Sequence, residues 1–247
     1  MQTNNSQFVP ERVYWASETL LKEVEASQFK ASAELREKVH HDLWGDMCAE
    51  YDAENLWAYL CTNGYFFSRP FMDSLDHWRA DERNHYVGLR SICSMMYGMS
   101  EAEIDMEMAR RIPDFSGIEF LMEDEFHICV VLAYDELVSA RGYRMFYDDF
   151  QQFGPAEVFQ WVRWASRDEA LHYKNFLAIV ERVHSHRLDE LPAAIEQIRA
   201  YENKPGMSYN ATFLLDHTEE TFSRSFLTNC SEQILNAFGM RSALRAS

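Results

Sequence analysis

The stretches ADERNHY (residues 80–86) and RDEALHY (residues 167–173) contain the same pattern twice in this 247-residue chain. Each has the form Asp-Glu-x-x-His-Tyr, and the two glutamates, Glu82 and Glu169, lie 87 positions apart. Side chains three positions apart on a helix lie on one face, so each glutamate can reach the same point in space as the histidine that follows it. A carboxylate together with an imidazole suits a divalent transition metal such as iron or manganese.

The sequence around these motifs predicts an all-α protein. Apolar residues recur at three- and four-residue intervals, and the chain has only 9 Gly and 6 Pro to interrupt long helices. We expect a single domain over residues 1–247, with a core bundle at about residues 29–186. The expected helices cover residues 12–26, 29–62, 71–97, 101–111, 118–150, 156–186, 188–202 and 210–238.

Four of the expected helices are long, and their connections indicate how they are arranged. A short break joins the first two, another joins the last two, and a longer segment, residues 98–117, connects the pairs. Two antiparallel hairpins with one long crossover is the connectivity of a ferritin-like four-helix bundle. The sequence therefore predicts such a bundle, with additional helices at the N- and C-terminal ends.

One Glu-x-x-His pair supplies too few ligands for a metal, so we expect bridging carboxylates from the other two helices. Residues at the same height in a helical hairpin are equally far from its turn. Reflecting the first motif through the turn near Phe66 leads to Glu50, and reflecting the second through the turn near Phe153 leads to Glu136. The intervals from these residues to the motif glutamates nearly agree, at 32 and 33 positions.

The surroundings of Glu136 favour a metal-binding role. It stands in the mostly apolar run CVVLAYDELV, where an unpaired carboxylate would be costly to bury. Glu54, one turn from Glu50, remains an alternative ligand. The expected metal ligands are Glu50, Glu82, His85, Glu136, Glu169 and His172.

With these residues the chain resembles, over about residues 40–186, the ferritin-like diiron carboxylate superfamily. That family takes one Glu from each of two helices and Glu-x-x-His from each of the other two. The longer form Asp-Glu-x-x-His resembles its oxygen-activating branch. By this resemblance Asp81 hydrogen-bonds His172 and Asp168 hydrogen-bonds His85, which fixes the tautomer of each ring.

The resemblance implies a non-haem diiron oxidoreductase. Two Fe ions would use O₂ as co-substrate to hydroxylate or desaturate a small organic substrate, acyl or aliphatic in character, and a mixed Mn/Fe centre stays open. Electrons would come from a separate reductase or ferredoxin, since no flavin, NAD or Fe–S motif occurs. The implied alternatives are a ferroxidase, iron store or peroxidase, an N-oxygenase acting on an amine, and a dimetal scaffold that only binds a partner.

Several features resemble the acyl-carrier-protein desaturases in particular. These are the helices outside the bundle, the 54-residue interval between Glu82 and Glu136, and the hydroxyl of Ser139 one turn after Glu136. A substrate bound to an acidic carrier protein would need a local basic patch. The arginines that could form one are Arg141, Arg144, Arg163 and Arg167.

Other members of the superfamily differ from this chain at single positions. Ribonucleotide reductase small subunits carry a radical Tyr where this chain has Leu89, and diiron arylamine N-oxygenases carry an extra His where it has Ala165. Small residues one turn from the ligands predict an apolar substrate pocket, although they equally fit close helix packing. The candidate pocket residues are Ala53, Leu89, Ala133, Ser139, Ala140, Tyr143 and Ala165.

Composition excludes several classes of partner. The net charge of −17 argues against binding to nucleic acid or to an anionic membrane surface. The five cysteines are odd in number and form no CxxC, which favours a reducing, cytoplasmic location over a disulfide framework. The polar N-terminus predicts no signal peptide, and no apolar run is long enough for a membrane span. A homodimer stays open.

Overall fold

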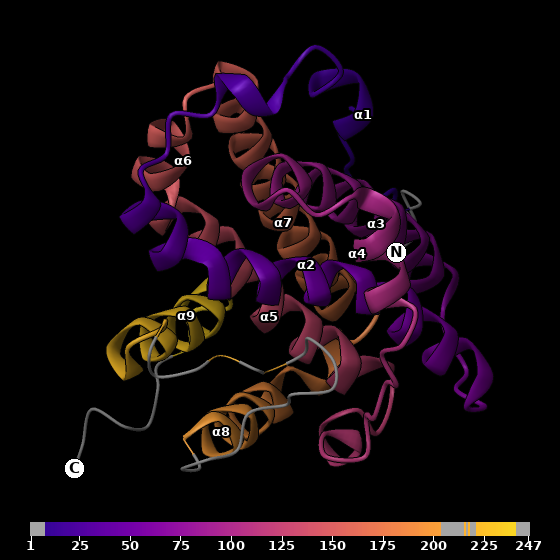
Figure 1. The fold of residues 1–247 in the computed structure, drawn as a ribbon. Coiled ribbons are helices and arrows are strands. Elements are labelled where there is room, and N and C mark those ends of the chain that lie inside the picture. The colour runs from indigo at the N-terminus through magenta and orange to yellow at the C-terminus, as the bar shows by residue number, and fades with distance from the viewer. Residues whose placement is uncertain (1–7, 204–214, 216, 218–220, 241–247) are drawn as a thin grey trace.

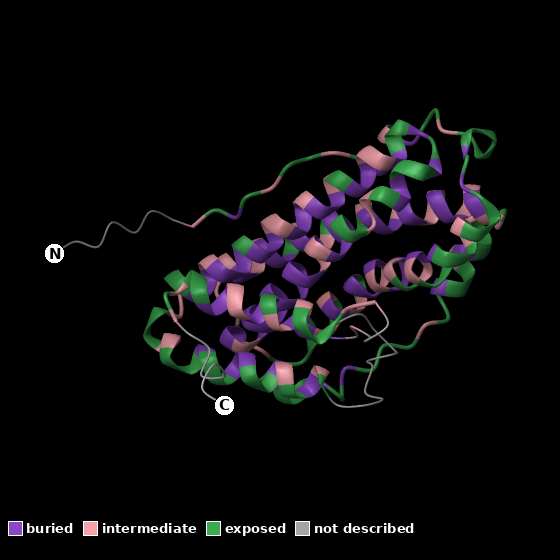
Figure 2. Cartoon of the chain, turned by 90° about the vertical axis from the view of Figure 1, so that its left-hand side faces the viewer, coloured by how far each residue is buried: buried purple, intermediate pink, exposed green. Residues whose placement is uncertain are grey.

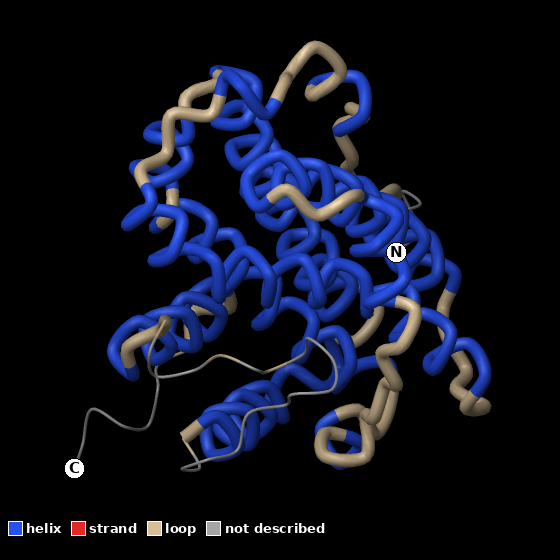
Figure 3. Tube along the Cα trace, in the orientation of Figure 1, coloured by secondary structure: helices blue, strands red, loops and turns tan. Residues whose placement is uncertain are grey.

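The structure, a computed structural model, describes residues 8–203, 215, 217 and 221–240, and every regular element in these ranges is a helix (Figures 1 and 3). The all-α prediction is confirmed. Among the described helices, none combines the length and the apolar character that crossing a bilayer requires. The α-helices are α1 Ser17–Leu20, α2 Ala33–Thr62, α3 Arg69–Tyr97, α4 Glu101–Met108, α5 Glu125–Met145, α6 Tyr147–Phe153, α7 Ala156–Arg182, α8 Leu191–Glu202 and α9 Arg224–Ala237.

The four longest helices pack as two hairpins. Helix α2 packs against α3, α5 packs against α7, and the two hairpins meet where α3 contacts α7. Helix α6 lies at the connection between α5 and α7, and α4 lies in the long segment between the hairpins (Figure 1). Helices α8 and α9 cover α5 and contact each other. As a result α5 is buried on nearly every side.

Side-chain caps define where the long helices begin. Ser32 caps α2 and Ser68 caps α3, each accepting a hydrogen bond from a backbone N–H in the first turn. Ser100 and Glu103 form the predicted capping box at the start of α4. Helix α3 ends at Gly98, whose φ of 76° lies in the left-handed region that glycine adopts without strain.

The predicted N-terminal helix, residues 12–26, is wrong. Only the four residues of α1 are α-helical there, and the chain before them is extended. Side chains of the bundle occupy the backbone groups that a helix would use. The Asn175 side chain accepts from the N–H of Glu11 at 2.9 Å and donates to its carbonyl at 2.8 Å, and Asn84 accepts from the N–H of Ser17 at 2.7 Å.

Two other predicted helices have different bounds. The expected helix 118–150 starts only at Glu125, because the Asp124 side chain caps α5 by accepting from the N–H of His127 at 3.1 Å, and Phe146 separates it from α6. Of the expected helix 210–238, the described part is α9, which is capped by Ser223. The rest of that prediction falls mostly on residues outside the described ranges.

Helices α3 and α7 approach closely because of one glycine. A Cβ atom at Gly88 would lie 1.8 Å from Nε1 of Trp161, so any larger residue would push the two helices apart. The Trp161 indole fills the space above Gly88 and donates to the Ser17 hydroxyl at 2.9 Å. This contact brings together the two helices that carry the repeated motif.

Figure 2 shows buried residues along all the long helices, and the apolar ones among them form two clusters. One, the α8–α9 cluster, includes residues of α8 and α9; the other, the α6 cluster, includes residues of α6 and α4. The helices α2, α3 and α7 each pass from one cluster to the other, and a polar layer lies at the crossing. The cluster residues that flank this layer are Cys48 and Ala53 on α2, Trp78 and Tyr86 on α3, and Ala165 and Tyr173 on α7.

Candidate metal centre

The polar layer between the clusters contains two groups of possible metal ligands. Each group has three glutamates and one histidine, with one ligand atom from each residue lying within 4.8 Å of the others. All members are buried, with exposed fractions of 7% or less. These groups could hold metal ions. The His85 group is Glu50, Glu82, His85 and Glu169; the His172 group is Glu82, Glu136, Glu169 and His172.

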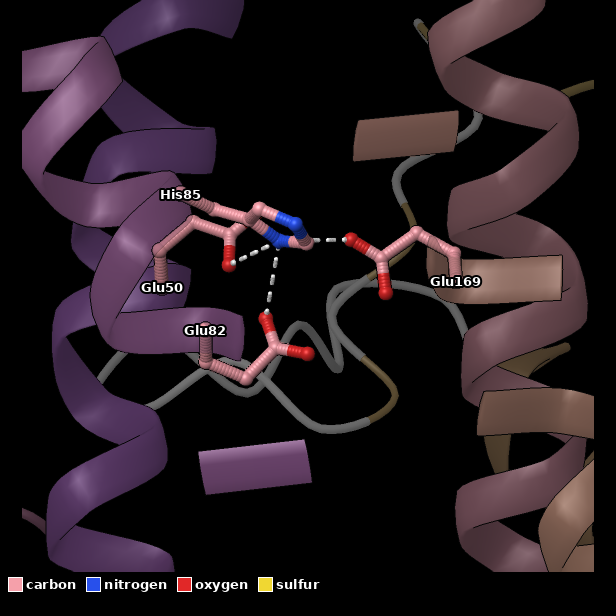
Figure 4. A group of neighbouring side chains, drawn as sticks. All are labelled: Glu50, Glu82, His85 and Glu169. Atoms are coloured by element: carbon pink, nitrogen blue, oxygen red, sulfur yellow. Dashed lines mark ion pairs between the residues drawn. The ribbon is translucent and has the colours of Figure 1, made fainter. Parts of the chain in front are cut away.

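In the His85 group, three carboxylates from three helices surround one ring nitrogen (Figure 4). Nδ1 of His85 lies 3.4 Å from Oε2 of Glu50 and 3.6 Å from Oε2 of Glu82. Oε1 of Glu169 reaches across from α7 to within 3.1 Å of the same nitrogen. Helices α2, α3 and α7 therefore each contribute a possible metal ligand near Nδ1 of His85.

The His172 group repeats this arrangement on the other side. Nδ1 of His172 lies 3.1 Å from Oε1 of Glu82. It lies 3.0 Å from Oε2 of Glu136 and 3.0 Å from Oε2 of Glu169. The positions reached by reflection through the hairpin turns, Glu50 and Glu136, thus each meet one histidine.

The shared carboxylates are the glutamates of the repeated motif. Glu82 directs Oε2 at His85 and Oε1 at His172, and Glu169 likewise uses one oxygen for each ring. Glu50 belongs only to the His85 group and Glu136 only to the His172 group. This differs from the expectation that Glu50 and Glu136 bridge. The motif glutamates lie on α3 and α7, which face each other, so their carboxylates meet at the centre.

Glu54 does not belong to either group. Its side chain is exposed and pairs with Arg79 of α3, which donates from Nε to Oε2 of Glu54 at 2.7 Å. Glu54 lies one turn after Glu50 on α2, and at that height its side chain is exposed whereas that of Glu50 is buried. Between these two alternatives, the structure brings Glu50 to the histidines.

Each histidine is held from behind by an aspartate of the opposite motif. Nε2 of His172 lies 3.2 Å from Oδ2 of Asp81, and Nε2 of His85 lies 3.5 Å from Oδ2 of Asp168. These contacts follow the crossed pairing that the resemblance implies. A proton on Nε2 that is donated to the aspartate leaves the Nδ1 lone pair directed at the carboxylates, which is the form of histidine that binds a metal.

The donor set fits a pair of divalent cations. Oε2 of Glu50, Oε1 of Glu82 and Nδ1 of His85 are buried and make no hydrogen bond to any described residue. Buried polar atoms without such partners are costly, and metal coordination would satisfy them. Four carboxylates carry the charge that two divalent ions would balance. Oxygen and imidazole nitrogen donors together suit iron or manganese.

The pKa values of Glu50 and His85 are both raised, which also shows that the site favours bound positive charge. Burial raises the pKa of Glu50 well above its usual range, and the neighbouring charge of Glu82 adds to the rise. Burial would lower the pKa of His85, but the carboxylates of Glu50 and Glu169 outweigh it and raise that pKa well above the ordinary value. Crowded buried carboxylates favour any bound cation, whether a proton or a metal ion.

The extended N-terminal segment holds both aspartates, which the sequence did not indicate. Arg12 donates from Nε to Asp81 at 2.9 Å, and the Trp15 indole N–H donates to Asp168. Arg167 also donates to Asp168, at 2.9 Å. Nothing in the local pattern marks Arg12 or Trp15, because their partners lie far away in the sequence.

Two further hydrogen bonds support the glutamates that are not shared. The Trp78 indole donates to Oε1 of Glu136 at 2.7 Å, and the Tyr143 hydroxyl donates to Oε1 of Glu50. Tyr143 was among the predicted pocket residues. A buried donor beside each carboxylate fixes its orientation.

Two cavities reach the site, and both reach it at Glu50. The smaller, of about 80 Å³, is lined by residues that include Ser139, Tyr143 and Phe222. The larger, of about 390 Å³, lies between α2 and α3. Of the predicted pocket residues, only Ser139 and Tyr143 line either cavity. The others are buried in the helix packing, because their small size brings helices together: Ala53, Leu89, Ala133, Ala140 and Ala165.

The arginines proposed as a carrier-binding patch mostly serve internal contacts. Arg141 donates to Gln233 of α9, Arg144 donates to the Ser166 hydroxyl at 3.3 Å, and Arg167 pairs with Asp168. Arg163 is exposed and lies over the Phe159 ring. Each of the four arginines thus contacts a different residue of the protein.

Comparisons of this chain with protein-family models, with curated proteins and with solved structures each found no match. The geometry of the polar layer is therefore the basis for any functional assignment.

Proposed function

We propose that this chain is a ferritin-like diiron protein that uses O₂ to hydroxylate or desaturate a small organic substrate. The observation that carries the proposal is the pair of donor groups that share Glu82 and Glu169. Two adjacent sites with two common carboxylates suit two ions held side by side. The hairpin packing and the crossed Asp–His contacts also agree with the ligand arrangement of ferritin-like carboxylate proteins.

When bound, a pair of iron ions would supply the redox chemistry with O₂ that no side chain of this protein can perform. The residues that would hold them are those of the His85 and His172 groups. An external reductase or ferredoxin would supply electrons.

The protein's own side chains would hold and shield this centre. Asp81 and Asp168 keep a proton on Nε2 of each histidine, so that Nδ1 stays available as a ligand. Tyr143 holds one carboxylate oxygen of Glu50, and the other, Oε2, accepts no hydrogen bond from a described residue and is available to a metal ion. The apolar clusters on either side limit the access of water to the polar layer, which the two cavities reach only at Glu50.

A second candidate is a ferroxidase, and the 80 Å³ cavity favours it. Asp46 and Asp135 line that cavity beside Glu50. Carboxyl groups along a passage to the site would attract and guide entering cations. In this case iron itself would be the substrate.

One experiment separates the two candidates. The protein is loaded with Fe(II) under nitrogen and then mixed with O₂ and a panel of small organic compounds. An oxidised organic product that forms in step with O₂ consumption supports the oxygenase. Iron oxidation without any organic product, especially in a large hollow assembly seen by sedimentation, supports the ferroxidase. Failure to retain iron at all would contradict both.

A further inference from the structure

The larger cavity has the size and position of a substrate site. At about 390 Å³ it falls within the range of about 300–1,000 Å³ typical of small-molecule pockets. It is lined by residues of α2 and α3, together with Asp105 of α4, and it includes Glu50 of the His85 group. A molecule that fills this cavity would therefore reach one of the proposed metal ligands.

Three arginines line the cavity, and two of them are already paired. Arg79 donates to Glu54, and Arg90 pairs with Asp105 at 2.8 Å and with Glu101 at 2.9 Å. Glu54 neutralises Arg79, whereas Arg90 lies between two carboxylates, so this second group carries one net negative charge.

The third arginine, Arg83, is exposed and makes no ion pair with any of the described residues. Arg83 is thus the one arginine of the cavity that pairs with no carboxylate of the described residues, in a chain whose net charge is −17. Arginine presents a planar set of N–H donors that matches a carboxylate.

Most residues that line the cavity are charged or polar, and Tyr51, Tyr86 and Val87 form an apolar stretch of its wall. Tyr51 and Tyr86 pack edge to face with ring centroids 5.2 Å apart, and Val87 lies beside Tyr86 on α3. The Tyr86 hydroxyl is already committed, since it donates to Asp105 at 2.5 Å. The cavity therefore combines one free cation with apolar ring surface.

We propose that the substrate of this site is a free monocarboxylic acid whose carboxylate pairs with Arg83. Its aliphatic or aromatic body lies along Tyr51 and Val87 and extends toward Glu50. A single guanidinium without an ion pair matches a carboxylate better than a phosphate monoester, which carries nearly two negative charges. The identity of the oxidised substrate rests on the function proposed above, but binding of the acid does not.

Calorimetry on the Fe(II)-loaded protein under nitrogen tests this inference without turnover. The probes are hexanoate, octanoate, phenylacetate and 3-phenylpropanoate, each compared with its neutral amide. We expect at least one acid to bind at least about tenfold more tightly than its amide, which corresponds to about 1.4 kcal/mol. Phenyl phosphate is included to test the choice of anion.

Variants of Arg83 identify the group responsible. We expect Arg83→Ala to weaken acid binding about tenfold and to leave amide binding unchanged, and Arg83→Lys to restore part of the affinity. The matched control is Arg110→Ala, which removes the same charge from an exposed arginine that lines neither cavity. It should bind the acids like the unmodified protein.

Three results would overturn the inference: no binding by any of the acids, equal affinity for acids and amides, or no effect of Arg83→Ala. Tighter binding of phenyl phosphate than of phenylacetate would overturn the assignment to a carboxylate.

Metal content is measured on the same samples. Two ions per chain without acid binding would refute only this inference, whereas Arg83-dependent acid binding in a chain that retains no metal would refute the proposed function and leave an acid-binding pocket.

Discussion

The two donor groups use the same residue types but have different surroundings. Glu50, in the His85 group, lines both cavities, and its Oε2 atom makes no hydrogen bond to a described residue. Glu136, in the His172 group, lines neither cavity and accepts a hydrogen bond from Trp78 at 2.7 Å. Similar ligands thus form one half that small molecules can approach and one half that is sealed in the core. Under the proposed function, we expect substrate to approach the His85 half and the His172 half to stay enclosed by the helices.

The largest effect is expected where the two halves overlap. Glu169→Gln keeps the volume of the side chain but replaces one of its two oxygens by an amide nitrogen and removes the negative charge, so one group loses a donor oxygen and both lose an anionic ligand. We expect metal content after Fe(II) loading and gel filtration to fall from two ions per chain to less than one, as measured by elemental analysis. Glu54→Gln is the control, because that residue lies outside both groups. A Glu169→Gln protein that still holds two ions would show that the carboxylate is not shared.

Substitution of the unshared glutamates should separate the halves. We expect Glu50→Gln and Glu136→Gln each to lose one ion and the stabilisation it provides. At free metal about 100 times the dissociation constant, one site adds about 2.7 kcal/mol, or about 5–10 °C in Tm for a chain of this size. Water can enter beside position 50 through the cavities and replace the lost donor, so the loss at position 136 should be greater. Thermal melts with and without metal measure this, and a greater loss for Glu50→Gln would contradict the asymmetry.

Substitutions in the N-terminal segment should have a smaller effect on metal binding, and each should affect only one of the two donor groups. Trp15→Phe removes the donor to Asp168, behind His85, and Arg12→Gln removes the ion pair to Asp81, behind His172. Loss of such supporting contacts typically weakens metal binding about 10–100-fold. Titration with Mn(II) followed by electron paramagnetic resonance should show one weakened site in each variant. Val9→Ala, an exposed position in the same segment, is the control. Equal weakening of both sites would mean that the segment acts only on overall stability.

Much of this arrangement follows from helical regularity. The reflection that selects Glu50 and Glu136 depends only on the constant rise of a helix and on the position of two turns. The apolar residues on either side of Glu136 likewise indicated that this carboxylate is buried. Where helices are regular and hairpins are short, heights along the bundle can be read from residue numbers.

Other features could not be predicted because they depend on contacts between distant segments. Residues 12–26 have apolar spacing typical of a helix, yet Asn175 and Asn84 occupy the backbone groups of Glu11 and Ser17. The small residues around the site predicted a pocket, but whether Ala133 or Ala165 borders a cavity depends on how closely the facing helix approaches. Here Gly88 lets α7 approach α3 closely, and the space is filled by Trp161.

The central claim is that Glu82 and Glu169 lie between two metal ions. Crystals grown from Fe(II)-loaded protein and measured at the iron absorption edge would locate the ions by anomalous scattering. We expect two peaks, one in contact with Glu50 and His85 and one in contact with Glu136 and His172, with the motif glutamates touching both. A single peak, or peaks at surface carboxylates with none in the polar layer, would contradict it.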